Sequence, residues 1–171
     1  AAIFSFTLIF NIILDLGLTH FNNRAIAQDG AQVARNFSRL TGLKLLLGFV
    51  YLLIALVLGY LLEYTSTAFI LLLILVINQF LASFILFLRS HLAGLHLFKS
   101  DSVMSVLDKL LMIVTCGALL FTNILSEEFT VIHFALAQLV SYLLAAGIGF
   151  TMVLGRARVF KFHFDFKNYG K

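Results

Sequence analysis

The chain has 171 residues, of which 61% are hydrophobic and 12% charged, with a formal net charge of +4 and a mean hydropathy of +1.04. The charged fraction is about half that of soluble globular domains, and a soluble domain of this length could not bury so much apolar surface. The composition therefore excludes a soluble domain and predicts an integral membrane protein.

Five apolar runs follow one another along the chain, each close to the ~20 residues that a helix needs to cross a bilayer. They cover approximately residues 1–19, 43–62, 68–88, 103–122 and 130–154. Strands of a membrane barrel would be about half as long and would alternate polar and apolar residues. These runs do not alternate, so we expect an all-α protein with five transmembrane helices.

The segments between the runs alternate in charge. Residues 20–42, 89–102 and 155–171 carry more Lys and Arg than Asp and Glu, whereas residues 63–67 and 123–129 contain no Lys or Arg. By the positive-inside rule the three basic segments are cytoplasmic, which places the first residue outside and the C-terminal tail in the cytoplasm. The short external turns predict antiparallel helix pairs.

A short amphipathic helix is predicted before the second run. Residues 31–44 place Val33, Phe37 and Leu40 at helical spacing, with basic residues elsewhere around the axis. This pattern is typical of a helix that lies on the inner membrane surface.

Polar residues form a stripe on the opening run. Asn11, Asp15, Thr19 and Asn22 follow the i, i+4, i+8, i+11 spacing of one helix face. The stripe fits either the wall of a hydrated cavity or hydrogen bonds that only hold helices together. For Asp15 we favour the cavity role, because burying a carboxylate costs more than burying an amide.

Arg24 follows Asp15 by nine residues, about 180° round a straight helix and about 13 Å along it. The two side chains therefore cannot pair on one straight helix. Either Gly17 bends the segment or Arg24 faces another partner, with ordinary positive-inside anchoring as the plain alternative.

A second polar group interrupts the third run. Asn78 and Gln79 lie mid-run, and Arg89 follows Asn78 by eleven residues and shares its helix face. The two amides could bind the hydroxyls of a sugar, and the guanidinium below them could bind a phosphate. The planar guanidinium of arginine matches the geometry of phosphate oxygens. The alternative is interhelical amide hydrogen bonding with an arginine anchor at the helix end.

For two further features we favour a structural explanation over a functional one. Asp108 and Lys109 lie about two turns into the fourth helix and could neutralise each other or neighbouring helices. Small residues recur every fourth position on the fifth run and, once, on the second, which lets a neighbouring helix approach closely. They are Ala137, Ser141, Ala145 and Gly149, and Ala55 and Gly59.

No chemical motif indicates an enzyme, a metal site, a cofactor or nucleic-acid binding. His91 and His96 are five residues apart, not the four of a helical metal pair. Gly-rich phosphate loops, nucleophile elbows and zincin motifs are missing from the sequence, and its single Cys116 forms no intrachain disulfide.

Two stretches resemble bacterial polysaccharide (Wzx-type) flippases of the MATE-like superfamily. The first is Asp15-Leu16-Gly17-Leu18 followed by Arg24-Ala25-Ile26-Ala27-Gln28-Asp29, which is similar to the second-helix motif. The second runs from Arg89 through Phe98 and from Asp101 through Lys109, and looks like the region joining helices four and five. With the five spans, the resemblance covers the chain as helices two to six of one lobe, so we expect a piece of a longer protein.

The resemblance implies a transporter that moves undecaprenyl-pyrophosphate-linked oligosaccharide across the bacterial inner membrane by alternating access. It implies that Arg24 and Arg89 contact phosphate or sugar and that Asp15 lines the cavity or couples ions. From the polar pattern described above, Asn78, Gln79 and Asn22 are our further candidates for substrate contacts, and Asn11 and Asp108 for cavity or coupling residues. The implied partners are the lipid-linked oligosaccharide, membrane lipids and a second lobe of the same protein, with polysaccharide polymerase machinery as a further candidate.

Two other functions fit the same helices. A drug or ion exporter of the same superfamily would be inhibited by organic cations. A membrane enzyme acting on the lipid carrier should have a large external loop or catalytic acids at a water-facing end, and the external turns here are short.

Overall fold

The computed structural model describes residues 14–15, 33–62, 65–121 and 130–156. Four long helices make up almost all of this part: α4 (Val33–Leu61), α5 (Ser66–Gly94), α6 (Phe98–Phe121) and α7 (Val131–Arg156). Leu14 and Asp15 are also helical, but the rest of the first predicted span lies outside the described residues. Within the described part every regular element is a helix, which confirms the all-α prediction.

Each of the four helices contains a segment long and apolar enough to cross a membrane. These segments are Arg39–Leu61, Ser66–Gly94, Phe98–Leu119 and Val131–Gly155. The chain is therefore a multi-pass membrane protein.

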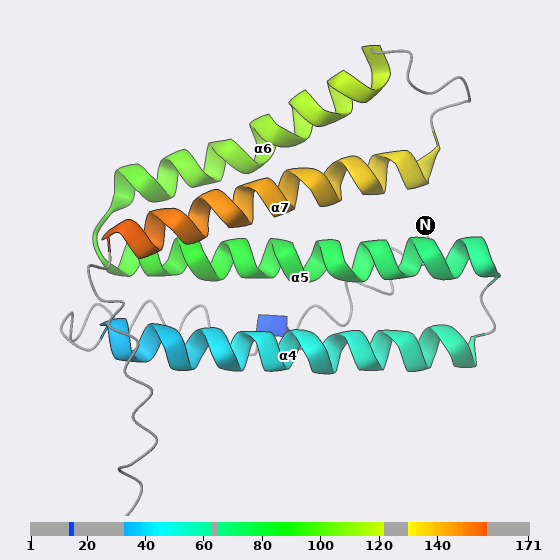
Figure 1. Cartoon of the computed structure of the whole chain (residues 1–171), viewed down its shortest axis with the longest axis horizontal. Helices are drawn as coiled ribbons and strands as arrows, with labels where there is room; N and C mark the ends of the chain where they lie inside the picture. The colour runs from blue at the N-terminus through cyan, green and yellow to red at the C-terminus, as the bar shows by residue number, and fades with distance from the viewer. Residues whose placement is uncertain (1–13, 16–32, 63–64, 122–129, 157–171) are drawn as a thin grey trace, which may run out of the picture.

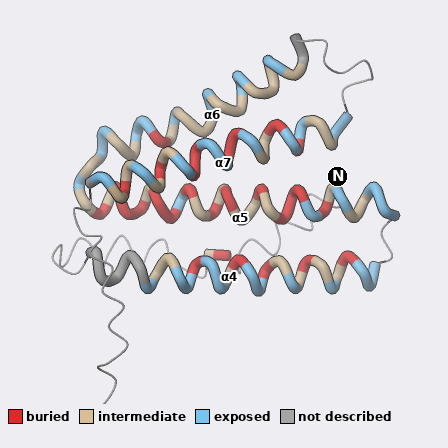
Figure 2. Tube along the Cα trace, in the orientation of Figure 1, coloured by how far each residue is buried: buried red, intermediate tan, exposed pale blue. Residues whose placement is uncertain are grey.

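The four helices run antiparallel to their chain neighbours. In Figure 1, α5 lies between α4 and α7, and α7 lies between α5 and α6. The central position of α5 explains why buried positions recur along most of its length, as Figure 2 shows. On α4 the buried positions recur only every three or four residues.

The predicted surface helix over residues 31–44 is wrong as a separate element, because α4 is continuous from Val33 to Leu61. The stretch contains no proline, and the helical hydrogen-bond ladder passes through Thr41 and Gly42 into the apolar run. Residues 33–42 thus form one continuous helix with the second span.

The connection predicted over residues 89–102 is also much shorter than expected. Helix α5 extends to Gly94 and α6 begins at Phe98. His96 adopts φ 57°, and two backbone bonds close the turn, from His96 N to Ala93 O (2.9 Å) and from Leu97 N to Leu92 O (2.9 Å). This pair of bonds is a Schellman C-cap with His96 in the left-handed position that usually favours glycine.

The row of small residues on α7 is a close helix contact, as predicted. Ala137, Ser141 and Ala145 are at most 3% exposed, and Ser141 Oγ lies 2.6 Å from Thr115 Oγ1 of α6. A side chain added at Gly149 would run into Met104 of α6 and Leu88 of α5. The row therefore sets how closely α6 and α5 approach α7.

The outer face of α6 remains apolar and uncovered. Val106, Leu110, Ile113 and Val114 are each more than half exposed. Lipid tails would cover such a face in a bilayer, as expected for a helix at the edge of a membrane bundle.

Candidate functional site

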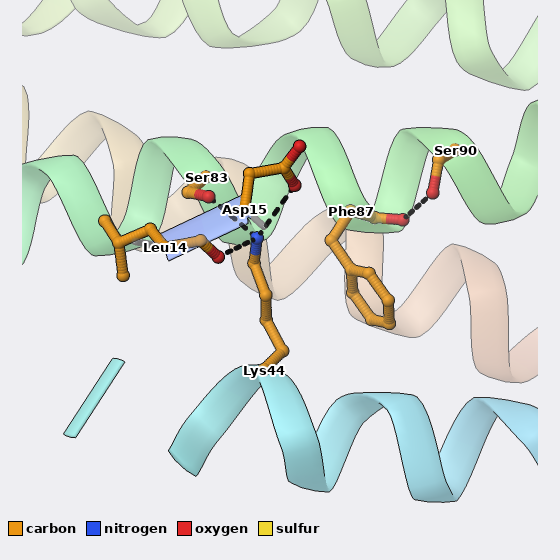
Figure 3. Close-up of polar contacts among 6 residues, drawn as sticks. All are labelled: Leu14, Asp15, Lys44, Ser83, Phe87 and Ser90. Atoms are coloured by element: carbon orange, nitrogen blue, oxygen red, sulfur yellow. Dashed lines mark hydrogen bonds and ion pairs between the residues drawn. The ribbon is translucent and has the colours of Figure 1, made fainter. Parts of the chain in front are cut away.

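A lysine is enclosed among the helices. Lys44 of α4 is 0% exposed, and its ammonium donates to the backbone oxygen of Leu14 (2.8 Å) and to Ser83 Oγ of α5 (2.8 Å). It also contacts Asp15 Oδ1 at 3.4 Å. Figure 3 shows the side chain reaching from α4 to these three oxygens, which match the three donors of a lysine ammonium.

The position of Lys44 follows from the helix face on which it lies. Lys44, Gly48, Tyr51 and Ala55 are spaced i, i+4, i+7 and i+11, and all four are buried. Tyr51 and Ala55 pack with Leu14 in one apolar cluster. Because the lysine shares a face with these residues, it points into the bundle and not toward lipid.

The two charged groups are buried to different degrees. The Lys44 side chain is 0% exposed, whereas the Asp15 side chain is 38% exposed. The 3.4 Å contact is also longer than the ≈ 2.7–2.9 Å of a strong charge-assisted bond. The ammonium is therefore held mainly by two neutral oxygens, and Asp15 balances its charge from an accessible edge of the site.

Of the residues predicted for this region, the structure places Asp15 in the lysine site. Asn11, Asn22 and Arg24 lie outside the described residues. The sequence interpretation included Lys44 only as the last residue of the surface helix predicted over residues 31–44. The signal that could have identified it is its spacing from Ala55 and Gly59, the small residues already expected to face a neighbouring helix.

Asn78 binds the neighbouring helix α7. Its side chain is 2% exposed, and Nδ2 donates to Ala135 O (3.0 Å) and Gln138 Oε1 (3.3 Å). Gln138 Nε2 in turn donates to Tyr142 Oη (3.1 Å). These are interhelical hydrogen bonds, which the sequence analysis named as the alternative to substrate contact. The next residue, Gln79, is half-buried.

Arg89 is tied to the start of α6. Its Nε donates to Asp101 Oδ1 at 2.7 Å, and the two side chains are 27% and 25% exposed. This ion pair closes the α5–α6 turn. Arg89 lies about 16 Å along the helix from Asn78 and about 9 Å from Ser83, so the structure does not combine these groups in one site.

Asp108 is paired within its own helix. Its Oδ2 lies 3.2 Å from Lys109 Nζ, with the Asp108 side chain 14% exposed and that of Lys109 66% exposed. The carboxylate and the ammonium neutralise each other, which was the first of the two alternatives for this pair.

No cluster of three or more potential metal ligands occurs among the described residues. His91 is buried against Phe87, with ring centroids 5.3 Å apart, whereas His96 is exposed in the α5–α6 turn. Comparisons with protein-family models, with curated proteins and with solved structures found no match. The function must therefore be inferred from the chemistry of the Lys44 and Arg89 sites.

Proposed function

We propose that the chain forms part of one lobe of a transporter that carries lipid-linked oligosaccharide, with an undecaprenyl-pyrophosphate carrier, between the two leaflets of a bacterial inner membrane. The observation that carries this proposal is the lysine site: Lys44, within the membrane-spanning segment of α4, is enclosed and paired with Asp15, whose side chain is 38% exposed. Ionisable groups at membrane depth are costly and usually serve transport or binding.

A polar cavity is what such a substrate requires. Pyrophosphate and sugar cannot enter hydrocarbon without compensating interactions. Asp15, which is 38% exposed beside the enclosed Lys44, would lie on the wall of a hydrated space between this lobe and a second one. Rocking of the two lobes would then open this space to each side of the membrane in turn.

Arg89 is the proposed phosphate contact. The Asp101 carboxylate accepts a hydrogen bond from Arg89 Nε. Within the described part of the chain, neither terminal amino group of the guanidinium has a hydrogen-bond partner. Those two groups form the outer edge of the planar fork that suits phosphate oxygens. The Asp101 contact would hold the fork in place at the membrane surface.

The test compares three variants of the full-length protein in cells that depend on it for export. We expect Arg89→Ala to abolish surface polysaccharide and to accumulate lipid-linked intermediate, at unchanged protein level in the membrane. Arg89→Lys should retain part of the export, since a lysine is a point charge without the fork.

Asp101→Asn is the matched control, because it removes the ion pair but keeps the arginine. Export should largely persist in this variant if Arg89 binds phosphate. Normal surface polysaccharide in Arg89→Ala would contradict the phosphate role. If Asp101→Asn lost as much export as Arg89→Ala, Arg89 would only stabilise the α5–α6 turn.

A further inference from the structure

The oxygens around Lys44 resemble the ligand set of a small cation. The ammonium contacts one backbone carbonyl (Leu14), one carboxylate (the adjacent Asp15) and one hydroxyl (Ser83), which come from two parts of the chain. Hard cations select such oxygen ligands, and transporters coordinate Na⁺ with backbone carbonyls inside the membrane. We call Leu14 O, Asp15 Oδ1 and Ser83 Oγ the oxygen cage.

We propose that this oxygen cage is a monovalent-cation site that the Lys44 ammonium fills permanently, and that it binds Na⁺ when the lysine is truncated. The charge of the ammonium supports this assignment: truncating Lys44 removes one positive charge beside Asp15, and a monovalent cation restores that charge. A tethered cation cannot dissociate, so the native protein needs no sodium at this position.

The location of the cage also fits a cation site. Lys44 lies within the membrane-spanning part of α4, and Ser83 within that of α5. Leu14, in the segment between them, packs onto Tyr51 and Val76. The ammonium thus joins α4 to the two segments that supply the cage oxygens, which would otherwise lack a compensating donor in an apolar interior. The Asp15 side chain, 38% exposed, is the least buried of the cage residues, so an ion would enter the cage from this edge.

The experiment measures thermal unfolding of the purified full-length protein in NaCl, KCl or choline chloride at one ionic strength, which equalises screening. Wild-type protein should show the same Tm in all three salts. Lys44→Ala should have a lower Tm in choline chloride and gain roughly 3–6 °C for each tenfold increase in NaCl above its dissociation constant. The same variant should bind one additional sodium ion compared with wild type.

Lys44→Met is the matched control. It removes the same charge, but its side chain still fills the cage, so its Tm should not depend on sodium. The double variants test the ligands: Lys44→Ala with Ser83→Ala should bind sodium more weakly, and Lys44→Ala with Asp15→Asn should lose the response.

Two results would overturn the proposal: a Tm of Lys44→Ala that rises equally in NaCl and choline chloride, or a wild-type Tm that rises with sodium as steeply. If Lys44→Ala folds only when purified in NaCl, the proposal is supported. If it folds in neither salt while Lys44→Met with Asp15→Asn does fold, the proposal fails. None of these readouts involves oligosaccharide, so they are independent of the proposed transport function.

Discussion

At the scale of single residues, the unequal burial of Lys44 and Asp15 decides what each contributes. The ammonium is fully enclosed, whereas the Asp15 side chain is 38% exposed. Removing the charge of one partner of an ion pair leaves the other charge without compensation. The cost in free energy of unfolding depends on how exposed the remaining group is. The two neutralising substitutions should therefore differ in their effects on stability.

We expect Asp15→Asn to lower the free energy of unfolding by roughly 3 kcal/mol, because it leaves a buried cation without its counter-charge. Lys44→Met should cost about 1–2 kcal/mol, since it leaves a partly solvated carboxylate and two oxygens without their donor. Denaturation of both variants in sodium-free buffer measures the difference. Equal losses, or a larger loss for Lys44→Met, would show that the two groups are buried alike.

The residue scale is also where sequence reasoning was least complete. Asp15 was identified because a carboxylate inside an apolar run is costly. Lys44 was not, because a lysine near the end of a run is ordinarily a surface anchor. Its partner Ser83 lies 39 residues away. No local sequence pattern predicts a contact between residues that far apart in the chain.

At the scale of elements, the small residues of α7 determine how the helices pack. Ser141 contacts Thr115 of α6, and Gly149 leaves room for Met104 and Leu88. Between membrane helices, close backbone approach and such hydrogen bonds replace the hydrophobic driving force that water would provide. The spacing of four along the sequence was sufficient to predict this contact.

We expect Gly149→Val to destabilise the protein by about 1–3 kcal/mol, because the added carbons must displace Met104 and Leu88 in a packed seam. Gly147→Ala is the matched control: it lies two residues earlier on the same helix, is exposed, and a Cβ there meets no atom within 4 Å. Its Tm should be unchanged or slightly higher, since alanine is the better helix former. If the two variants have similar Tm values, the close contact at Gly149 contributes little to stability.

Element boundaries followed the sequence less closely than element positions. The charges at residues 33–42 and 89–94 suggested connections, yet both stretches are helical. Hydropathy marks where a helix leaves hydrocarbon, whereas the helix itself ends only where its hydrogen bonds end. For α5 that end is the turn at His96.

At the scale of the whole molecule, the arrangement in Figure 1 places the α5–α6 turn at one end of the bundle and the α4–α5 turn at the other. The basic segments predict that the first of these ends is cytoplasmic. Lys99 of α6 and Thr65, before α5, are both exposed and lie at opposite ends.

Single cysteines at these two positions test the orientation. In a Cys116→Ala background, Lys99→Cys should react with a membrane-impermeant maleimide only after the cytoplasmic face is opened. Thr65→Cys should react in intact spheroplasts. The reverse pattern would overturn the predicted orientation, and labelling of both in intact spheroplasts would contradict the membrane-spanning character of α5.

The sequence by itself determined the class of protein, the four described helices and the small-residue seam, because hydrophobicity and helical spacing are local properties that one chain segment carries alone. Only the tertiary structure decided which charged groups are enclosed. It rotated α4 so that Lys44 faces the oxygens of Leu14, Asp15 and Ser83, and it joined Arg89 to Asp101 across a turn of three residues, Leu95, His96 and Leu97. Contacts of this kind depend on how neighbouring helices are rotated and packed, and therefore on many residues at once.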